Sequence, residues 1–330
     1  MPPAFRTRRA LLVASALACA RPAATRAQAA AWPTRPVRLV VPFPAGGATD
    51  IVARVVAQKL VAALGQPVLV DNRPGAGGTI GADAVAKAAP DGHTLLVSTS
   101  STHSIAPALN PRLPFDAFAD FTPVAHVANA ASVLVVGSAF PRGGAPELVA
   151  MLRSSPGRYN YGSSGIGTYP HLMAELFKWR AGGLYVVHVP YRGTGLVLTD
   201  LVAGQILFLM DSVVSAQAQI RDGKVRALAV SGARRSRSLP EVPTFAEAGV
   251  PGMDVSNWFG VLGPAGLPAP IVERVNREVD ALVRAPDVVE RFDALGAESA
   301  GGPPERLART MRAEYDSWKA VIRRAGIKPE

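Results

Sequence analysis

The fold is decided by the stretch VRLVVPFPAGGATD, residues 37–50. It begins with an apolar run typical of a strand and continues into a loop with two adjacent glycines, Gly46 and Gly47. Over the following residues, 51–64, apolar side chains recur every four positions, which predicts an amphipathic helix that stops at Gly65. A strand, a glycine loop and a helix in this order predict the first unit of a parallel sheet.

The same alternation continues along the chain. Further strands are predicted over 68–70, 94–98, 132–136, 159–161, 184–189, 206–210 and 225–230. Further helices are predicted over 80–89, 146–153, 169–179, 196–203, 217–221, 271–283 and 307–325. The predicted fold class is therefore α/β, with two lobes that each hold a mostly parallel sheet flanked by helices. We expect residues 30–133 and 228–330 to form the first lobe, and residues 134–227 to form the second.

Composition and charge exclude several classes of protein. The chain has 330 residues, a length typical of two domains. Hydrophobic residues make up 48% and charged residues 18%, which excludes global disorder. The net charge is +10, but residues 1–29 supply +5 of it through five arginines and no acid. Because the rest of the chain has no concentrated basic stretch, we expect no nucleic-acid partner.

Residues 1–29 have the pattern of an export signal. The segment Arg6-Thr7-Arg8-Arg9 precedes an apolar run over 10–20 that is too short to span a bilayer, and Ala27-Gln28-Ala29 has the form of a cleavage site. We expect a periplasmic protein, exported by the general secretory route rather than the twin-arginine route, which the sequence fits loosely. The single cysteine, Cys19, lies inside this signal in a poor lipidation sequence, so cleavage would leave a chain without disulfides or cysteine chemistry.

The loop over 42–50 is a candidate anion site. It lies between the first strand and the first helix, and ligands of parallel sheets bind at the carboxyl ends of the strands. Its glycines let a ligand approach the backbone, and the first turn of the helix has unpaired N–H groups and a partial positive charge. The alternative is an ordinary glycine turn in which Thr49 or Asp50 caps the helix.

A second candidate loop, YGSSGIGT over 161–168, occupies the same position in the second unit. It combines glycines with hydroxyl groups, although a flexible turn with a helix cap is the alternative. Other strand ends add the candidates Ser98, Tyr191, Arg192 and Asp211. Arg192 is the most natural side-chain partner for a carboxylate, because a guanidinium group can bind it with two hydrogen bonds. Its alternative is an ordinary surface arginine.

Signatures of common enzymes are missing from the sequence. It contains no nucleophile elbow, no dinucleotide-binding fingerprint and no phosphate-binding loop. The five histidines have no metal-ligand spacing, so neither a metal nor another cofactor is expected. A secreted serine hydrolase remains as a rival interpretation, with Ser163 or Ser164 as the nucleophile and His171 or His188 as the base.

Several short motifs follow one another along nearly the whole chain after residue 31. They are VPFPAGGATD (41–50), DNRPGAGG (71–78), PDGHTLL (90–96), DFTPV (120–124), VPYRG (189–193), RALAV (226–230) and LPEVPT (239–244). Each motif is weak alone, but their order and spacing together are specific. In these motifs the sequence resembles the substrate-binding proteins of tripartite tricarboxylate transporters, the Bug-type periplasmic solute receptors.

The resemblance implies a type II periplasmic binding fold, in which two lobes close on a ligand that usually carries a carboxylate. The loop that would hold this carboxylate, through backbone groups and ordered waters, matches the family at Phe43, Ala45, Gly46, Gly47 and Asp50. The facing loop matches at Ser163, Ser164, Gly165 and Thr168. Leu207 stands where the family commonly has Asp, and Leu196 where it often has Pro or Ala. The resemblance therefore implies the fold, but it does not determine the local surface of the second lobe or the choice of ligand.

We therefore expect a periplasmic receptor, and not an enzyme, that captures a small organic carboxylate between two lobes. The expected partners are the membrane permease subunits of a tripartite transporter, or a sensor kinase, and the receptor is expected to be a monomer. Two alternatives of the same fold remain. One is a receptor for phosphonate or another oxyanion, since helix N-termini accept those anions equally well, and the other is a signalling sensor.

Overall fold

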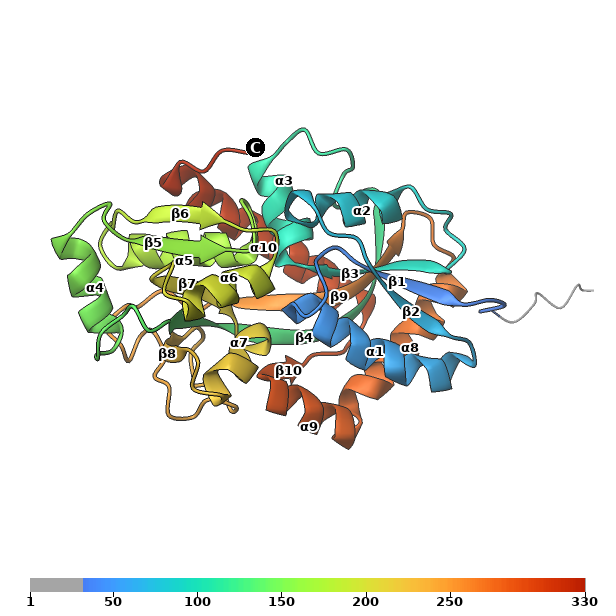
Figure 1. Ribbon diagram of the computed structural model, residues 1–330. Coiled ribbons are helices and arrows are strands. Elements are labelled where there is room, and N and C mark those ends of the chain that lie inside the picture. Colours follow the sequence, from blue (N-terminus) through green and yellow to red (C-terminus); the bar gives the residue numbers. More distant parts are fainter. Residues whose placement is uncertain (1–31, 330) are drawn as a thin grey trace, which may run out of the picture.

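The computed structural model describes residues 32–329, which form two lobes connected by shared strands (Figure 1). The predicted export signal and Cys19 lie outside the described residues. The strand order is β2-β1-β3-β9-β4-β7-β5-β6, and β8 and β10 also pair with β4. The strands are β1 (Val37–Val41), β2 (Val68–Asn72), β3 (Thr94–Thr99), β4 (Phe121–Val136), β5 (Asn160–Ser163), β6 (Val187–Pro190), β7 (Phe208–Ser212), β8 (Arg226–Val230), β9 (Ser256–Pro264) and β10 (Ala297–Ser299).

The first lobe is built on the parallel strands β1, β2 and β3. One face of these strands packs against α1 (Ala48–Leu64) and α8 (Ala269–Arg284), whose buried side chains join those of β1 and β3 in one core. The helix α1 ends as predicted, because Gly65 adopts the left-handed conformation (φ 67°) that most side chains disfavour. A shorter helix, α2 (Thr79–Ala86), contributes to the core on the opposite face.

The second lobe repeats this plan with the parallel strands β5, β6 and β7. The helices α4 (Ala145–Ser154) and α5 (Tyr169–Arg180) enclose one core with these strands, and α6 (Thr194–Val202) and α7 (Val213–Arg221) enclose another. Parallel pairing and covering helices are therefore confirmed in both lobes. The strands that connect the lobes differ from this expectation, because β4 pairs antiparallel with β7, β8, β9 and β10.

The strand β4 belongs to both lobes. Its residues 121–131 pair with β9, and its residues 132–136 pair with β7 and β8. The sequence predicted only the second part of β4 and did not predict β9. The chain therefore enters the second lobe along β4 and returns just before β9. Pairing between β4 and β8 extends to Val230, past residue 228, and the predicted lobe limits remain a proposal.

Ser231 connects the two segments of the chain that pass from one lobe to the other, namely β4 and the segment just before β9. We call this region the hinge. The backbone N–H of Ser132 in β4 donates to Ser231 Oγ at 2.8 Å, and this hydroxyl donates to the carbonyl of Val255 at 2.6 Å. The buried side chain of Ser231 thus links both segments at the point where the chain passes between the lobes.

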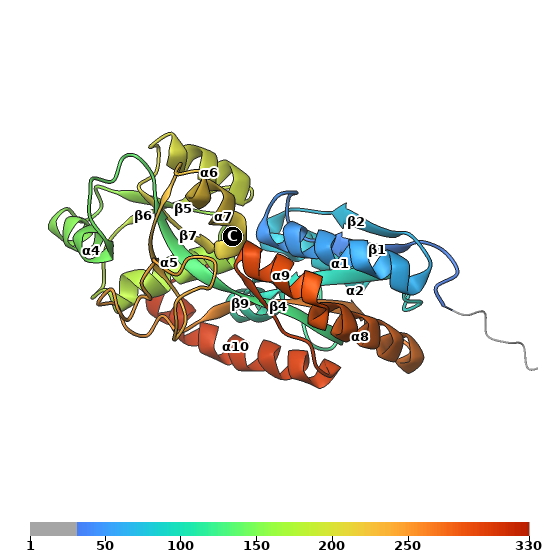
Figure 2. The ribbon, with the colours of Figure 1, turned by 90° about the horizontal axis from the view of Figure 1, so that it is seen from below.

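The last helix, α10 (Pro304–Ala325), lies along both lobes (Figure 2). Its Leu307 and Met311 pack in the first lobe with Trp258, whereas Trp318 and Ile322 pack in the core of the second lobe. The helix α9 (Pro286–Leu295), which was not predicted from the sequence, precedes β10. Short helical turns cover 76–78 (η1), 101–105 (η2) and 106–109 (α3). Among residues 32–329 no helix is long and apolar enough to cross a membrane.

Candidate functional site

A small inner cavity of about 50 Å³ lies between the lobes. The first lobe contributes the loop after β1, the segment after β3 and the start of β9. The second lobe contributes Ser164 after β5, the end of β7 and the starts of α5 and α6. The cavity is thus at the carboxyl ends of β1, β3 and β7, where a sheet of this kind binds ligands.

The start of α1 provides the backbone donors on the first-lobe side. Its N-cap is Gly47, and no side chain caps the helix by a hydrogen bond. The first residues of the helix, Ala48 and Thr49, line the cavity together with Gly47. Their N–H groups and the positive end of the helix dipole are therefore available to an anion.

The start of α6 provides a similar arrangement on the second-lobe side. Its N-cap is Gly193, at φ 111°, and again no side-chain cap is formed. Thr194 and Gly195, the first residues of α6, line the same cavity. The sequence predicted Tyr191 and Arg192 of this segment as site residues and a helix from residue 196, two residues after α6 begins at Thr194. Gly193 in front of an apolar helix is the signal for this earlier start.

Five of the residues predicted for the site line the inner cavity. They are Phe43, Ala45, Gly47, Ser164 and Asp211. Gly165, Tyr191 and Arg192 line an adjoining outer groove of about 710 Å³ between the same lobes. The structure therefore brings most of the predicted residues to one cleft, in two spaces that share lining residues.

Gly46 and Asp50 support the loop from behind the cavity. The Gly46 N–H donates to Asp50 Oδ2 at 2.9 Å, and the same carboxylate accepts hydrogen bonds from Arg54 and Asn72. Burial raises the pKa of Asp50, but these hydrogen bonds outweigh burial, so the pKa lies below its ordinary value. Asp50 is therefore an ionised anchor for the loop, and the Gly46 N–H is turned toward it.

Ser98, Ser163 and Thr168 are buried within their own lobes and do not line the inner cavity or the outer groove. Ser98 Oγ lies 2.7 Å from Nδ1 of His103, and Thr168 Oγ1 donates to the carbonyl of Gly165 at 2.7 Å. These hydrogen bonds fix the ends of β3 and the loop after β5. The three side chains thus hold the cleft in shape without facing it.

The Ser163 hydroxyl and His188 form the pair that the hydrolase interpretation required. Ser163 Oγ is 2.7 Å from Nε2 of His188, and the His188 ring stacks on His171 with centroids 4.0 Å apart. Burial, with help from His171, lowers the pKa of His188 to about 3, which makes it a weak base. Because Ser163 is fully buried, the pair is better explained as packing of the second lobe.

Two polar side chains in the cavity wall have unusual environments. Asn257, from β9, is 6% exposed, and its Oδ1 has no hydrogen-bond partner within the described part of the chain. Asp211, at the end of β7, is 2% exposed, and burial raises its pKa to about 7 despite a hydrogen bond from Ser215. No sequence pattern pointed to Asn257, because β9 itself was not predicted.

Direct contacts between the lobes surround the cavity. The N–H of Tyr169, at the start of α5, donates to Ser101 Oγ of the first lobe at 2.9 Å. Gly193 lies against Pro44, so closely that a Cβ atom added to it would be 2.7 Å from Pro44 Cγ. The two lobes are therefore in direct contact beside the cavity.

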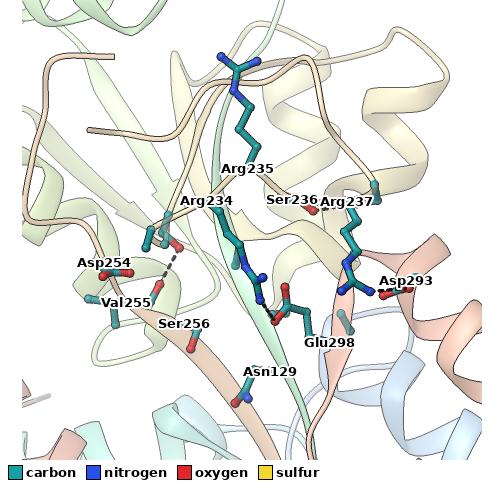
Figure 3. Close-up of a pocket in the computed structure, with 18 residues that line it drawn as sticks. Asn129, Arg234, Arg235, Ser236, Arg237, Asp254, Val255, Ser256, Asp293 and Glu298 are labelled. Carbon is teal, nitrogen blue, oxygen red and sulfur yellow. Dashed lines mark hydrogen bonds and ion pairs between the residues drawn. The ribbon is translucent and has the colours of Figure 1, made fainter. Parts of the chain in front are cut away.

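A separate pocket of about 250 Å³ lies beside the hinge (Figure 3). Two ion pairs cross it, from Arg234 to Glu298 at 3.6 Å and from Arg237 to Asp293 at 3.1 Å. Its arginines are balanced by acids, so it presents no excess positive charge to an anion. Over residues 32–329, no group of three or more His, Cys, Asp and Glu is placed to hold a metal ion.

Comparison with known proteins gives consistent matches over most of the chain. A family model described as "Tripartite tricarboxylate transporter family receptor" matches residues 52–327. The UPF0065 protein in the tcbD-tcbE intergenic region of Pseudomonas sp. strain P51 is 44% identical over 317 residues, which cover 96% of this chain and 94% of that protein. Two similar solved structures are R. palustris Rpa4515 with adipate (37% identity, TM-score 0.88) and the periplasmic binding protein BugD (33%, 0.86). Each alignment covers 91% of this chain and 100% of the other.

Proposed function

Because the chain belongs to the tripartite tricarboxylate transporter family of receptors, we propose that it captures a small carboxylate-bearing ligand in the cleft between its lobes. The family and the two-lobed fold predicted from the motifs are confirmed. The family consists of receptors and not of enzymes. The observation that carries the proposal is that α1 and α6, from opposite lobes, both begin at the inner cavity with a glycine cap and no side-chain cap.

Capture is proposed to begin on the first lobe. The ligand carboxylate accepts hydrogen bonds from the N–H groups at the start of α1, where Gly47 leaves room for its approach. Closure then brings the start of α6 and the Ser164 hydroxyl from the second lobe. Only contacts made in the closed form shift the equilibrium between the open and closed forms toward closure. Hydrogen bonds from the second lobe therefore couple ligand binding to closure.

The magnitudes are sufficient for a transport receptor. A hydrogen bond to a charged group contributes about 1.5–3 kcal/mol, and a helix terminus contributes about 0.3–2 kcal/mol. Four or five such contacts give a gross of about 6–15 kcal/mol, part of which offsets association and closure. A net of about −8 kcal/mol corresponds to a micromolar Kd.

We also propose where the receptor acts and what recognises it. The pattern over 1–29 supports export to the periplasm with removal of the signal, and BugD, a similar protein, is described as periplasmic. Permease subunits of a tripartite transporter, or a sensor kinase, would recognise the closed form of a monomeric receptor. Adipate bound to the similar Rpa4515 structure supports a carboxylate ligand here.

Calorimetry with a panel of mono- and dicarboxylates tests the proposal. We expect micromolar binding of at least one acid. Phosphonates and sulfonates in the same panel test the oxyanion alternative, and turnover of ester and amide substrates tests the hydrolase alternative. If folded protein binds none of the carboxylates, the proposed function is wrong.

Replacing Gly47 with valine is expected to weaken carboxylate binding by about tenfold or more. This loss corresponds to about one hydrogen bond to the charged group. The backbone at Gly47 is extended (φ −77°), so valine is tolerated, and the nearest atom to an added Cβ is the Pro44 carbonyl oxygen at 3.6 Å. The side chain would occupy the approach to the α1 donors. The measurement is Kd by calorimetry with Tm as a check of folding.

Gly144→Val is the matched control for this substitution. Gly144 is also an N-cap glycine, of α4, with an extended backbone (φ −104°), and it lines neither the inner cavity nor the outer groove. It should leave Kd unchanged. Equal losses of affinity in the two variants, or unchanged binding by Gly47→Val, would contradict the assignment of the carboxylate to the start of α1.

A further inference from the structure

The inner cavity and the outer groove share a boundary, which we call the neck and define by the residues that line both spaces. Phe43 and Pro44 from the first lobe, and Ser164 and Gly193 from the second, line both spaces. Because each lobe supplies half of it, the neck forms only when the lobes come together. A ligand longer than the inner cavity would pass this neck and place its far end in the groove.

The outer groove has one charged residue in its wall. Arg192 is the only charged side chain among the residues that line the groove, and it is exposed. None of the ion pairs within residues 32–329 involves Arg192. Its guanidinium group is therefore not neutralised by an acid of the protein and is available to an anion entering the groove.

The rest of the groove wall is uncharged and largely apolar. Ile80, on the first-lobe side, is 55% exposed and is one of few large hydrophobic side chains with such exposure in the described chain. Phe43 and Ile166 line the groove with it. Burial of these surfaces by a hydrocarbon segment is favourable because it removes apolar area from water. The neck and this wall suit a stem of methylene groups or a ring.

We propose that the outer groove is a second subsite, in which Arg192 binds an anionic group that the captured acid carries at the end of an apolar stem. This inference rests on the proposed function, because the first carboxylate of the same ligand occupies the inner cavity. Arg192 and the outer groove would then select the length of the ligand and the charge at its distal end. The backbone N–H groups at the starts of α1 and α6 would bind only the proximal carboxylate.

Arginine suits such a subsite for a physical reason. Its planar fork can give a carboxylate two parallel hydrogen bonds, and its long side chain adapts to ligands of slightly different length. An exposed ion pair contributes little, but a pair that closure partly removes from water contributes more. The distal contact is therefore expected to depend on closure and on the reach of the stem.

A ladder of straight-chain dicarboxylates from malonate to azelate, each paired with the monocarboxylate of equal carbon number, tests the proposal by calorimetry. We expect the dicarboxylate to bind more tightly than its partner only above a threshold length. In Arg192→Gln this advantage should fall by about 5-fold to 20-fold, as for one charge-assisted contact. The monocarboxylates should keep their affinity within about twofold, and Arg192→Lys should keep part of the advantage.

Arg142→Gln is the matched control, because Arg142 is an exposed arginine of the second lobe that lies outside the groove. It makes the same change in net charge and should leave every affinity unchanged. Dicarboxylates without an advantage at any length would overturn the second subsite while leaving the proposed function intact, provided that some acid binds. Equal losses for both ligand series in Arg192→Gln would also overturn it. Absence of binding by the whole ladder would overturn the subsite and the proposed function together.

Discussion

Replacing Gly193 with valine is expected to hold the lobes apart and to lower ligand affinity by about 10²-fold to 10⁴-fold. The Cβ atom alone would lie 2.7 Å from Pro44 Cγ and 3.1 Å from Pro44 Cδ, across the boundary between the lobes. A proline ring is rigid, so the clash is relieved only by separating the lobes. The expected loss corresponds to two second-lobe hydrogen bonds to a charged ligand, at about 1.5–3 kcal/mol each.

The substitution also strains the backbone at residue 193. This strain must be distinguished from the steric clash with Pro44, which is expected to keep the lobes apart. Gly193 has φ 111°, which valine rarely adopts, but that strain is present in the open and the closed form alike. Gly183→Val is the matched control, because Gly183 also belongs to the second lobe, has φ 83° and has no atom within 4 Å of an added Cβ. The control should lose stability without losing affinity.

Small-angle X-ray scattering with and without ligand distinguishes blocked closure of the lobes from a local disruption of the binding site. The wild-type protein should become more compact when a bound acid closes the cleft, whereas Gly193→Val should not. A Gly193→Val protein that still closes, and still binds as the wild-type protein does, would show that the contact between Gly193 and Pro44 does not limit closure.

Local sequence patterns predicted the first helix and the parallel strands of each lobe. The period of α1 and its stop at Gly65, and the parallel strands of each lobe, follow from spacing and turn chemistry alone. The loop after β1 could be selected as a site because its position after a strand already determines which edge of the sheet it occupies.

The strand β9 could not be predicted in this way, because its glycines weaken the strand signal. They are needed for packing: a Cβ on Gly260 would lie 2.6 Å from Leu307 of α10, and one on Gly263 would lie 2.6 Å from Leu267. These neighbours are distant in sequence or lie in a loop, so only the folded structure explains the glycines. Asn257 was missed as a cavity residue for the same reason.

The buried serines show a different limit of sequence reasoning. Ser163 and Ser98 follow or end strands, as ligand-binding hydroxyls do, but each points into its own lobe and bonds to a histidine. Alternation along a strand decides which face a side chain takes, and near a strand end a shift of one residue reverses that face. Ser164, the next residue after Ser163, is the one that reaches the cavity.

Asp211→Asn is expected to change how stability depends on pH. Burial raises the pKa of Asp211 from 3.8 to about 7, so the folded protein holds a proton that the unfolded chain has released. The stability due to this proton is complete below pH 3.8 and is lost as the pH rises to about 7, by up to about 1.4 kcal/mol per pH unit. Glu314, whose pKa burial also raises to about 7, adds the same trend in both proteins.

The difference between the two proteins therefore isolates Asp211. The Asn side chain can still accept the hydrogen bond from Ser215 Oγ, which is 2.7 Å from Asp211 Oδ2. We expect the free energy of unfolding of Asp211→Asn, relative to wild type, to rise by a few kcal/mol, at most about 4, between pH 4 and pH 7. Urea unfolding at a series of pH values measures it. A constant difference would mean that Asp211 is ionised throughout.

The same carboxyl group should make ligand affinity depend on pH above neutrality. Asp211 is the only carboxyl group among the residues that line the inner cavity. Ionised, it would lie in a buried space beside the ligand carboxylate, so binding would require it to take up a proton. The Kd of wild type should then rise about tenfold per pH unit above pH 7, or about 10²-fold by pH 9.

Asp211→Asn should remove this dependence, because its amide stays neutral. Near pH 6 the two proteins are expected to bind alike, and at pH 9 the variant should bind about 10²-fold more tightly than wild type. A ligand whose own groups do not titrate between pH 6 and pH 9 makes the comparison clean. Parallel pH profiles for the two proteins would show that Asp211 does not face the bound carboxylate, even if the stability difference behaves as expected. The two measurements thus separate the burial of Asp211 from its place in the binding site.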